Sequence, residues 1–297
     1  EADVSAAGTN SDLVERAEVV VDATPAGTGT TNRELYAARD VPAVFQGGEP
    51  ARVADTSFTA RVNYDDAVGA DATRVLSCNT TALARLLAPL DEAYGVESVR
   101  ATLVRRGGDP GQSDRGPIND ILPDPPGESH HAEDLTTVLP HLDVRTRGVR
   151  VPATLMHLQT VRVTLRDPPP GARSVRDLLD AESRLVVVDD DAGVRGCGDV
   201  MEMARELGRP RGDLFENCVF GASVALSGAE CSLFQAVHQE SDVVPENVDA
   251  VRALAGTADA AESRELTDRT LGIGGEETPG PKASERPVAG EAGDFWN

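Results

Sequence analysis

The sequence predicts an α/β protein in two parts, a parallel sheet with helices followed by a mixed sheet of longer strands. Residues 18–23 contain three consecutive valines and are typical of a short buried strand. A Gly-rich turn, a helix-like segment at 31–39 and a strand-like run at 41–45 follow it. Strand, helix and strand in this order favour a parallel sheet. The later strand-like segments are longer, which favours a mixed sheet. They lie at residues 96–106, 144–151, 155–165, 184–188 and 218–237.

The composition is strongly acidic. The 297 residues include 50 Asp and Glu against 28 Lys and Arg, giving a formal net charge of -22, and Lys282 is the only lysine. Such a surface repels itself in dilute buffer and is screened in concentrated salt, where the Debye length falls to roughly 3 Å at 1 M. The composition therefore predicts a halophilic cytoplasm. It also argues against a nucleic-acid partner, because no basic face is evident.

The cysteine content argues against disulfides and metal. Four cysteines are too few and too dispersed for a disulfide framework, and no two form a Cys-x-x-Cys pair. No apolar run approaches the roughly 18 residues of a membrane span, and no signal segment opens the sequence. We therefore expect a soluble, cytoplasmic protein with reduced thiols and no membrane partner. The cysteines are Cys78, Cys197, Cys218 and Cys231.

One of these cysteines ends a β-rich stretch and opens a helix-forming segment. Cys78 follows the run Arg74-Val75-Leu76-Ser77, and Asn79-Thr80-Thr81 after it suits a helix start. Unpaired N–H groups and the positive end of the helix dipole favour a thiolate, and they can lower a thiol pKa from ~8.5 towards neutrality. The alternative is a small buried side chain, the usual state of free cysteine. The other three cysteines lack such a context and are expected to be core or surface thiols.

The segment Ser77-Cys78-Asn79-Thr80-Thr81 resembles the active-site segment of glyceraldehyde-3-phosphate dehydrogenases, and the wider sequence resembles the archaeal (type II) branch of that family. Six further blocks resemble the family's blocks and follow in the family's order, which a chance match would not produce. They are Asp22-Ala23-Thr24-Pro25, Phe45-Gln46-Gly47-Gly48-Glu49, Gly116-Pro117-Ile118-Asn119, Ser129-His130-His131, Thr154-Leu155-Met156-His157 and His238-Gln239-Glu240-Ser241-Asp242-Val243-Val244-Pro245-Glu246-Asn247.

The resemblance implies a Rossmann-type nucleotide-binding domain and a mixed-sheet catalytic domain. Residues 1–77 would be the remaining part of the NAD(P)-binding domain, 78–240 the catalytic domain, 241–273 a C-terminal helix returning to the nucleotide domain, and 274–297 a flexible tail rich in Gly, Pro and Glu. The opening strand, Gly-x-Gly-x-x-Gly turn and helix of such domains are not seen, so we expect an N-terminal truncation. The Gly27-Thr28-Gly29 segment is either a tight turn or a loop lining the cofactor site.

The implied activity is the phosphorylating oxidation of D-glyceraldehyde 3-phosphate to 1,3-bisphosphoglycerate with NAD(P)+, in glycolysis and gluconeogenesis. Cys78 would attack the aldehyde to form a thiohemiacetal and then a thioester. His157 matches the family's catalytic histidine and would act as the base, its alternative being a hydrogen-bonded histidine of the sheet. Gln159 stands where the family often has a second histidine.

The expected ligand contacts also follow the resemblance. Ser77, Cys78, Asn79, His130 and His131 would bind glyceraldehyde 3-phosphate, although an adjacent histidine pair in a loop is usually solvated and also suits metal when a third ligand is present. The cofactor, NAD or NADP, would contact Gly48, Arg106 and Gln239. Without the resemblance, Gly48 is a turn glycine and Arg106 a strand-end arginine. Arg115 stands where the family often has lysine before Gly-Pro-Ile-Asn.

Two rival functions stay open at this stage. A semialdehyde dehydrogenase shares the thiohemiacetal chemistry, and a truncated remnant would keep the fold without holding a cofactor. The choice between NAD and NADP also stays open, because the residue that reads the ribose 2′ position normally follows a strand that this sequence lacks. The resemblance further implies inorganic phosphate as a second substrate and a homotetramer as the assembly.

Overall fold

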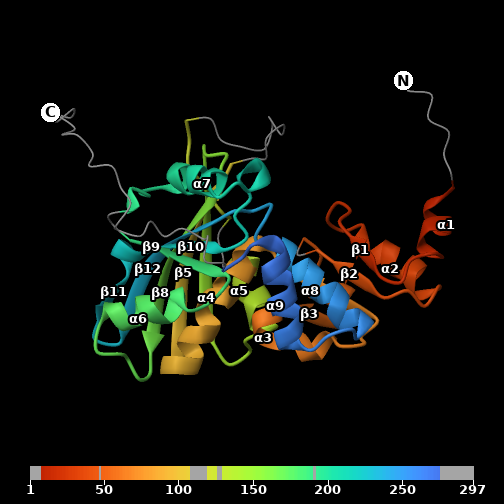
Figure 1. Cartoon of the computed structure of the whole chain (residues 1–297), viewed down its shortest axis with the longest axis horizontal. Helices are drawn as coiled ribbons and strands as arrows, with labels where there is room; N and C mark the ends of the chain where they lie inside the picture. The colour runs from red at the N-terminus through yellow and green to blue at the C-terminus, as the bar shows by residue number, and fades with distance from the viewer. Residues whose placement is uncertain (1–7, 47, 108–118, 126–128, 190–191, 275–297) are drawn as a thin grey trace.

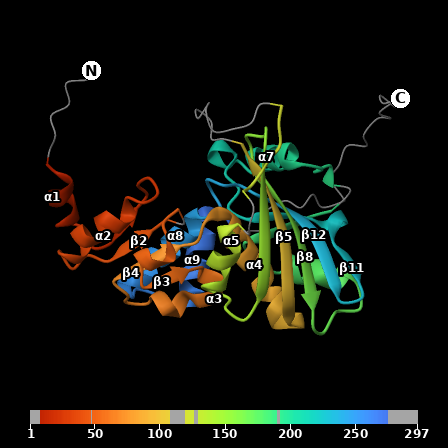
Figure 2. The ribbon, with the colours of Figure 1, turned by 180° about the vertical axis from the view of Figure 1, so that it is seen from behind.

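The computed structural model describes residues 8–46, 48–107, 119–125, 129–189 and 192–274 (Figure 1). Within these residues the chain forms a four-stranded and an eight-stranded sheet. Figure 2 shows the two sheets side by side, with the long strands gathered in one half of the molecule. The mixed α/β architecture predicted from the sequence is therefore confirmed. No helix in these segments is both long and apolar enough to cross a membrane.

The four-stranded sheet is parallel, with strand order β1-β2-β4-β3. Alternation along β2 sends Phe45 towards Tyr36 of α2 on one face and Val44 towards Ala250 of α8 on the other. Both faces are thus covered, as parallel sheets require. The elements are α1 (Asn10–Val14), β1 (Val20–Asp22), α2 (Gly29–Ala37), β2 (Ala43–Phe45), η1 (Ala51–Val53), β3 (Thr56–Phe58), α3 (Ala60–Asn63), η2 (Tyr64–Ala67), β4 (Ala72–Val75), α8 (Val244–Ala255) and α9 (Ala260–Leu271).

The larger sheet is mixed and has the strand order β6-β7-β5-β8-β12-β10-β9, with β11 beside β12. The central strand β5 pairs parallel with β7 and antiparallel with β8. The elements of this half are α4 (Cys78–Tyr94), β5 (Val96–Arg106), β6 (Leu122–Pro123), α5 (His130–Thr136), β7 (Asp143–Val151), β8 (His157–Leu165), α6 (Ala172–Asp180), β9 (Leu185–Val188), α7 (Cys197–Glu206), η4 (Pro210–Gly212), β10 (Asn217–Phe220), η5 (Gly221–Ser223), β11 (Ala225–Ser227) and β12 (Glu230–Val237).

One predicted strand is wrong in detail. Residues 218–237 were expected to form a single β segment, and they form the three strands β10, β11 and β12. Ser227 pairs with Glu230 across a two-residue turn whose Gly228 has φ +60°, a conformation that glycine adopts without steric cost. At Gly221 a Cβ would lie 2.8 Å from the carbonyl oxygen of Val188, so the bend there also needs glycine.

Helix α4 packs on one face of the large sheet and carries the main hydrophobic core. Leucines at helical spacing on α4 contact the inward-facing side chains of β5 and β8, and α5 and α6 join the same cluster. On the opposite face, α7 covers β9 and β10. The part of that face over β5, β7 and β8 holds a hollow of ≈ 990 Å³ lined in part by Arg100, Arg145, Arg147 and Arg162.

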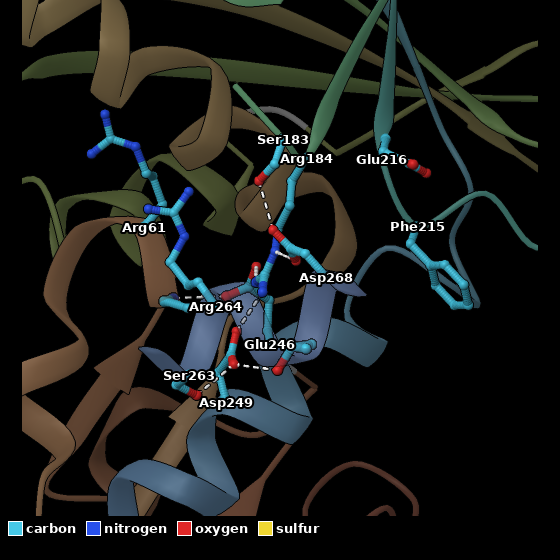
Figure 3. Close-up of polar contacts among 12 residues, drawn as sticks. Arg61, Ser183, Arg184, Phe215, Glu216, Glu246, Asp249, Ser263, Arg264 and Asp268 are labelled. Atoms are coloured by element: carbon cyan, nitrogen blue, oxygen red, sulfur yellow. Dashed lines mark hydrogen bonds and ion pairs between the residues drawn. The ribbon is translucent and has the colours of Figure 1, made fainter. Parts of the chain in front are cut away.

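A buried ion network joins the two halves of the structure (Figure 3). Arg184, just before β9, donates to Glu246 at 2.9 Å, Asp249 at 2.6 Å and Asp268 at 2.9 Å. Arg85 of α4 also donates to Glu246, at 2.7 Å. Burial alone would raise the pKa of Glu246, but the two guanidinium groups outweigh burial and lower that pKa to about 2. Helix α8 is thereby tied to α4, to the start of β9 and to α9.

Candidate active site

The nucleophile predicted from the sequence is the first residue of α4. Strand β4 ends at Val75, and Ser77 is the extended N-cap residue with φ −62° and ψ 156°. The Ser77 hydroxyl bonds the hydroxyl of Thr80 at 2.9 Å instead of capping a backbone amide, and Thr81 returns a hydrogen bond to the Leu76 carbonyl at 3.1 Å. The turn is thus closed by hydroxyl groups, and Cys78 is half-buried at the end of the parallel sheet.

The expected lowering of the Cys78 pKa is wrong for this structure. Burial raises the pKa of the thiol above its ordinary value, and the Asp242 carboxylate adds to that effect. The Asn79 backbone N–H and the positive charge of Arg106 act in the opposite direction but are weaker. The amides at the helix start favour the thiolate, but the cost of removing its charge from water is larger. The Asn79 side chain does supply a donor, with Nδ2 3.8 Å from Sγ.

His157 lies at the start of β8 and is only 4% exposed. Its Nδ1 accepts a hydrogen bond from the Arg106 backbone N–H at 3.0 Å. An amide N–H can only donate, so Nδ1 must act as an acceptor and the neutral ring carries its proton on Nε2. In this tautomer the imidazole is a hydrogen-bond donor through Nε2. The role of base, predicted from the sequence, would require the ring to move its proton and lose the Arg106 contact.

The histidine pair is split between two environments. His131 is 3% exposed, and its Nδ1 lies 3.2 Å from the Ser129 hydroxyl. Burial lowers the His131 pKa to about 3, and the neighbouring His130, Arg105 and His157 contribute in the same direction. His130 stacks on it with ring centroids 4.0 Å apart and is itself largely exposed. His131 is therefore neutral near pH 7 and suits a hydroxyl group better than a phosphate.

Arg106 connects several of the predicted site residues. Its Nε donates to Gln239 Oε1 at 2.9 Å and its Nη1 to the Thr154 carbonyl at 3.2 Å, while Nη2 pairs with Glu240. Its backbone holds His157, and its charge acts on Cys78. The end of β5, the start of β8, the loop after β12 and the start of α4 thus meet at one place.

The predicted cofactor loop follows β2, and Gln46 in this loop donates to Asn247 Oδ1 of α8 at 2.6 Å. Gly48 is exposed, and a Cβ at that position would lie 3.4 Å from the Ala26 side chain. The amides of Gly27 and Gly29 donate to Glu49 Oε1 at 2.7 and 3.0 Å. Because a carboxylate already occupies those amides, this turn does not fit a pyrophosphate. Gly47, Arg115 and Gly116-Pro117-Ile118 lie outside the described residues.

Three residues near Cys78 were named from the sequence but were given no role in the site. Gln159 is fully buried and donates from Nε2 to Asn79 Oδ1 at 2.9 Å. Asp242 is also fully buried, and neither carboxylate oxygen has a hydrogen-bond partner in the described part of the chain. Burial raises the Asp242 pKa to about 8, against the lowering effect of Arg85. Glu240 pairs with Arg106. Their positions depend on contacts across the sheet, which no local pattern reveals.

Cys78 is not the only cysteine at a helix start. Cys197 is the first residue of α7 and is also half-buried, so the helix-start signal does not distinguish the two thiols. The difference lies in their neighbours, since Cys78 has the Asn79 amide and the charges of Arg106 and Asp242 around it. Burial raises the pKa of Cys197. Cys218 and Cys231 are buried in the two hydrophobic clusters of the large sheet.

Comparison with known proteins identifies the family of this chain. A family model described as glyceraldehyde 3-phosphate dehydrogenase, C-terminal domain, matches residues 77–206. Glyceraldehyde-3-phosphate dehydrogenase of Halobacterium salinarum is 60% identical over 274 residues, covering 92% of this chain and 81% of the relative. The chain belongs to the glyceraldehyde-3-phosphate dehydrogenase family. The enzyme of that name from Haloarcula marismortui is 56% identical, covering 92% of this chain and 78% of the relative. The one from Methanococcoides burtonii is 44% identical, covering 91% of this chain and 80% of the relative.

These relatives confirm the archaeal-type glyceraldehyde-3-phosphate dehydrogenase family predicted from the sequence blocks, and salt-adapted organisms are among them. Among solved structures, aspartate semialdehyde dehydrogenase II of Vibrio cholerae matches with a TM-score of 0.59 at 12% sequence identity, covering 86% of this chain and 81% of that one. At that identity the likeness concerns the fold alone. The semialdehyde dehydrogenase alternative therefore gains no support from sequence.

Proposed function

We propose that this protein oxidises D-glyceraldehyde 3-phosphate to 1,3-bisphosphoglycerate, using NAD(P)+ and inorganic phosphate. The observation that carries the proposal is the position of Cys78 at the start of α4, with the Asn79 amide 3.8 Å from Sγ and the Arg106–His157 contact close by. A thiol, a donor to it and an imidazole are the groups that aldehyde oxidation through a thioester requires. Family membership supplies the substrate.

Cys78 reacts as the thiolate, after its proton has passed to solvent. Sγ forms a bond to the aldehyde carbon, and the π electrons of the carbonyl move onto oxygen. Loss of the carbon-bound hydrogen as hydride then re-forms the carbonyl and leaves a thioester on Cys78. A phosphate oxygen attacks this carbonyl carbon, the C–S bond breaks, and the acyl phosphate leaves with the thiolate restored.

His157 acts at the substrate oxygen. In the tautomer set by the Arg106 N–H, at 3.0 Å from Nδ1, the proton is on Nε2. Donation from Nε2 stabilises the negative charge that appears on oxygen when Cys78 attacks, which is where a fixed donor contributes most to catalysis. Hydride can leave from this alkoxide without a separate base. The imidazole thus serves as a donor in place of the base predicted from the sequence.

The neutral His131 receives the substrate hydroxyl, with Ser77, Asn79 and the exposed His130 as further polar contacts. Its pKa of about 3 means that it adds no positive charge near pH 7. Anion binding in this acidic protein then depends on amides and arginine side chains.

Arg106, Gln239 and Gly48 are the residues proposed to hold the cofactor. Gln239 Oε1 accepts from Arg106 at 2.9 Å, which leaves its Nε2 as the donating atom and suits a carboxamide oxygen. The chemistry that NAD(P)+ supplies when bound is acceptance of the hydride. The pair fits the polar end of a nicotinamide. Glu49 excludes the pyrophosphate from the Gly27–Gly29 amides, which it already binds.

The homotetramer implied by the resemblance has a surface available to it. The outer face of β5, β7 and β8 holds the arginine-lined hollow, and no helix covers this hollow in the part of the chain that the structure describes. In a chain of net charge -22, arginines gathered on one face lower the repulsion between copies there. Light scattering at molar salt measures the assembly, and a monomer at all protein concentrations would refute it.

Replacing each half-buried helix-start cysteine tests the nucleophile. Cys78→Ser should abolish oxidation of glyceraldehyde 3-phosphate, whereas Cys197→Ser, with the same position on its helix, should retain it. The absorbance of reduced nicotinamide follows the reaction, and mass spectrometry of the acylated peptide locates the thioester. Activity that survives in Cys78→Ser, or an acyl group found on Cys197, would overturn the proposal.

A further inference from the structure

Four side-chain amides form a continuous hydrogen-bonded chain from the large sheet to the thiol. Asn217 donates to Gln235 Oε1 at 3.0 Å, and Gln235 donates to Gln159 Oε1 at 2.8 Å. Gln159 donates to Asn79 Oδ1 at 2.9 Å, and Asn79 Nδ2 lies 3.8 Å from the Sγ of Cys78. The four side chains are at most 2% exposed. We call this chain, Asn217–Gln235–Gln159–Asn79, the amide relay.

Every amide of the relay points its nitrogen towards Cys78, and the backbone fixes that direction. Asn217 Nδ2 also donates to the Ala82 carbonyl at 2.9 Å, and Gln159 Nε2 to the Asn79 carbonyl at 3.0 Å. A carbonyl oxygen can only accept, so neither amide can turn over without losing a bond. Once Gln159 presents its nitrogen, Asn79 must present its oxygen to Gln159 and hence its NH2 group to the thiol.

The strand pattern explains how the relay reaches the site. Gln159 and Gln235 are direct partners in the β8–β12 pairing. Residues two apart on a strand share a face, so Gln159 stands on the same face of β8 as His157. Burying a side-chain amide destabilises a fold unless its N–H and C=O groups find hydrogen-bond partners. Here the partners form a directed chain that ends at a reactive atom.

We propose that Gln159, held by Gln235 and Asn217, is a positioning residue that turns the Asn79 amide so that its NH2 group stabilises the thiolate of Cys78. This inference uses the proposed function only for its catalytic consequence. The charged groups that act on Cys78 are Asp242 and Glu240, after β12, and Arg106, at the end of β5. The relay itself is uncharged and acts through hydrogen-bond direction.

The test is the pH at which Cys78 becomes reactive, read with iodoacetamide and peptide mapping on the full chain. Gln159→Met removes the donor to Asn79 at similar volume, and it should raise the midpoint of Cys78 alkylation by about one to two pH units, the worth of one hydrogen bond to a charged group. Gln159→His restores an N–H donor and should return the midpoint to within about half a unit. Thr160→Val, a neighbour that lines the hollow on the outer face of β8, should leave it unchanged.

A double variant separates the relay from a purely structural role. If Gln159 acts through Asn79, Gln159→Met should not shift the midpoint of Cys78 alkylation further in a protein that already carries Asn79→Ala. A general loosening of the fold would shift the midpoint equally with and without Asn79→Ala. An unchanged midpoint in Gln159→Met, or an equal shift in both backgrounds, would overturn the proposal. The alkylation midpoint is measured without turnover. The role of the relay is therefore tested independently of the proposed function, which the Cys78→Ser variant tests.

Discussion

At the scale of single residues, the contact between the Arg106 backbone N–H and His157 Nδ1 decides what the histidine can do. It holds the ring in the tautomer that donates from Nε2. Asparagine has a side-chain N–H donor but cannot take up a proton near neutral pH, so it distinguishes a donor from a base.

We predict that His157→Ala lowers kcat by roughly 10²–10³-fold, the usual contribution of one fixed donor to a developing oxyanion. His157→Asn should recover about a tenth or more of the lost rate, because a fixed donor to the oxyanion is a large part of such effects. Steady-state kinetics at saturating cofactor provide the measurement. His130→Ala, at the exposed ring, serves as the control and should raise KM with little change in kcat. An asparagine variant as slow as the alanine variant would restore the role of base.

The sequence named residues that lie together in the structure, but it did not predict their ionisation. Cys78, Asn79, Arg106, His157 and Gln239 were all named from local blocks, and the structure brings them together through Arg106 and Asn79. The direction of the Cys78 pKa was predicted wrongly, because it depends on the water that the rest of the fold excludes. Local spacing carries no information about that exclusion.

At the scale of elements, α8 is held by charges that are almost entirely buried. Arg184 bonds three carboxylates, and Glu246 also accepts the Ala60 backbone N–H at 2.7 Å (Figure 3). Such a network is not a large net source of stability, because burying the charges is itself expensive. Its effect is to allow one geometry between α8 and its neighbours, since removing one member leaves an unpaired buried charge.

We predict that Arg184→Met lowers the free energy of unfolding by about 3–5 kcal/mol, the usual cost of breaking a buried ion pair from one side. The control is Arg100→Met, which removes a 2.6 Å ion pair with Asp143 whose side chains are 43% and 54% exposed. That variant should cost no more than about 1 kcal/mol. Urea titration of both variants at the same salt concentration measures the difference. Equal losses would show that the buried network is held no more tightly than a surface pair.

The bounds of helices and strands were predicted well where hydrophobic periodicity determines them. They were predicted less well where a glycine bend ends a strand. The long strands β5 and β8 show an alternation of inward apolar side chains that the sequence displays directly. The division of residues 218–237 depends on the bends at Gly221 and Gly228, which an uninterrupted β-type composition hides. The amide relay was also hidden, because its hydrogen-bonded neighbours lie 18 to 80 residues apart along the chain.

At the scale of the whole molecule, the formal charge of -22 predicts a stability that depends on salt. We predict that the urea midpoint of unfolding rises as potassium chloride increases from about 0.1 M to about 2 M, because the Debye length falls from about 10 Å to a few Å and screens the repulsion. The penalty of Arg184→Met should stay nearly constant over the same range, since its partners are buried. A midpoint that falls with salt would contradict the prediction.

The amide relay has a further consequence for a protein whose formal net charge is -22. Dissolved ions screen the interactions between charges, but they have little effect on the hydrogen bonds of a neutral amide buried beneath α4. A nucleophile adjusted by surface carboxylates would change its reactivity whenever the salinity of the cell changed. One adjusted by Asn79, Gln159, Gln235 and Asn217 keeps the same donor at its sulfur in dilute and in saturated brine. The hydrogen-bond donor at the sulfur is therefore independent of salt, whereas the effect of the half-exposed Glu240 on Cys78 is screened as the salt concentration rises.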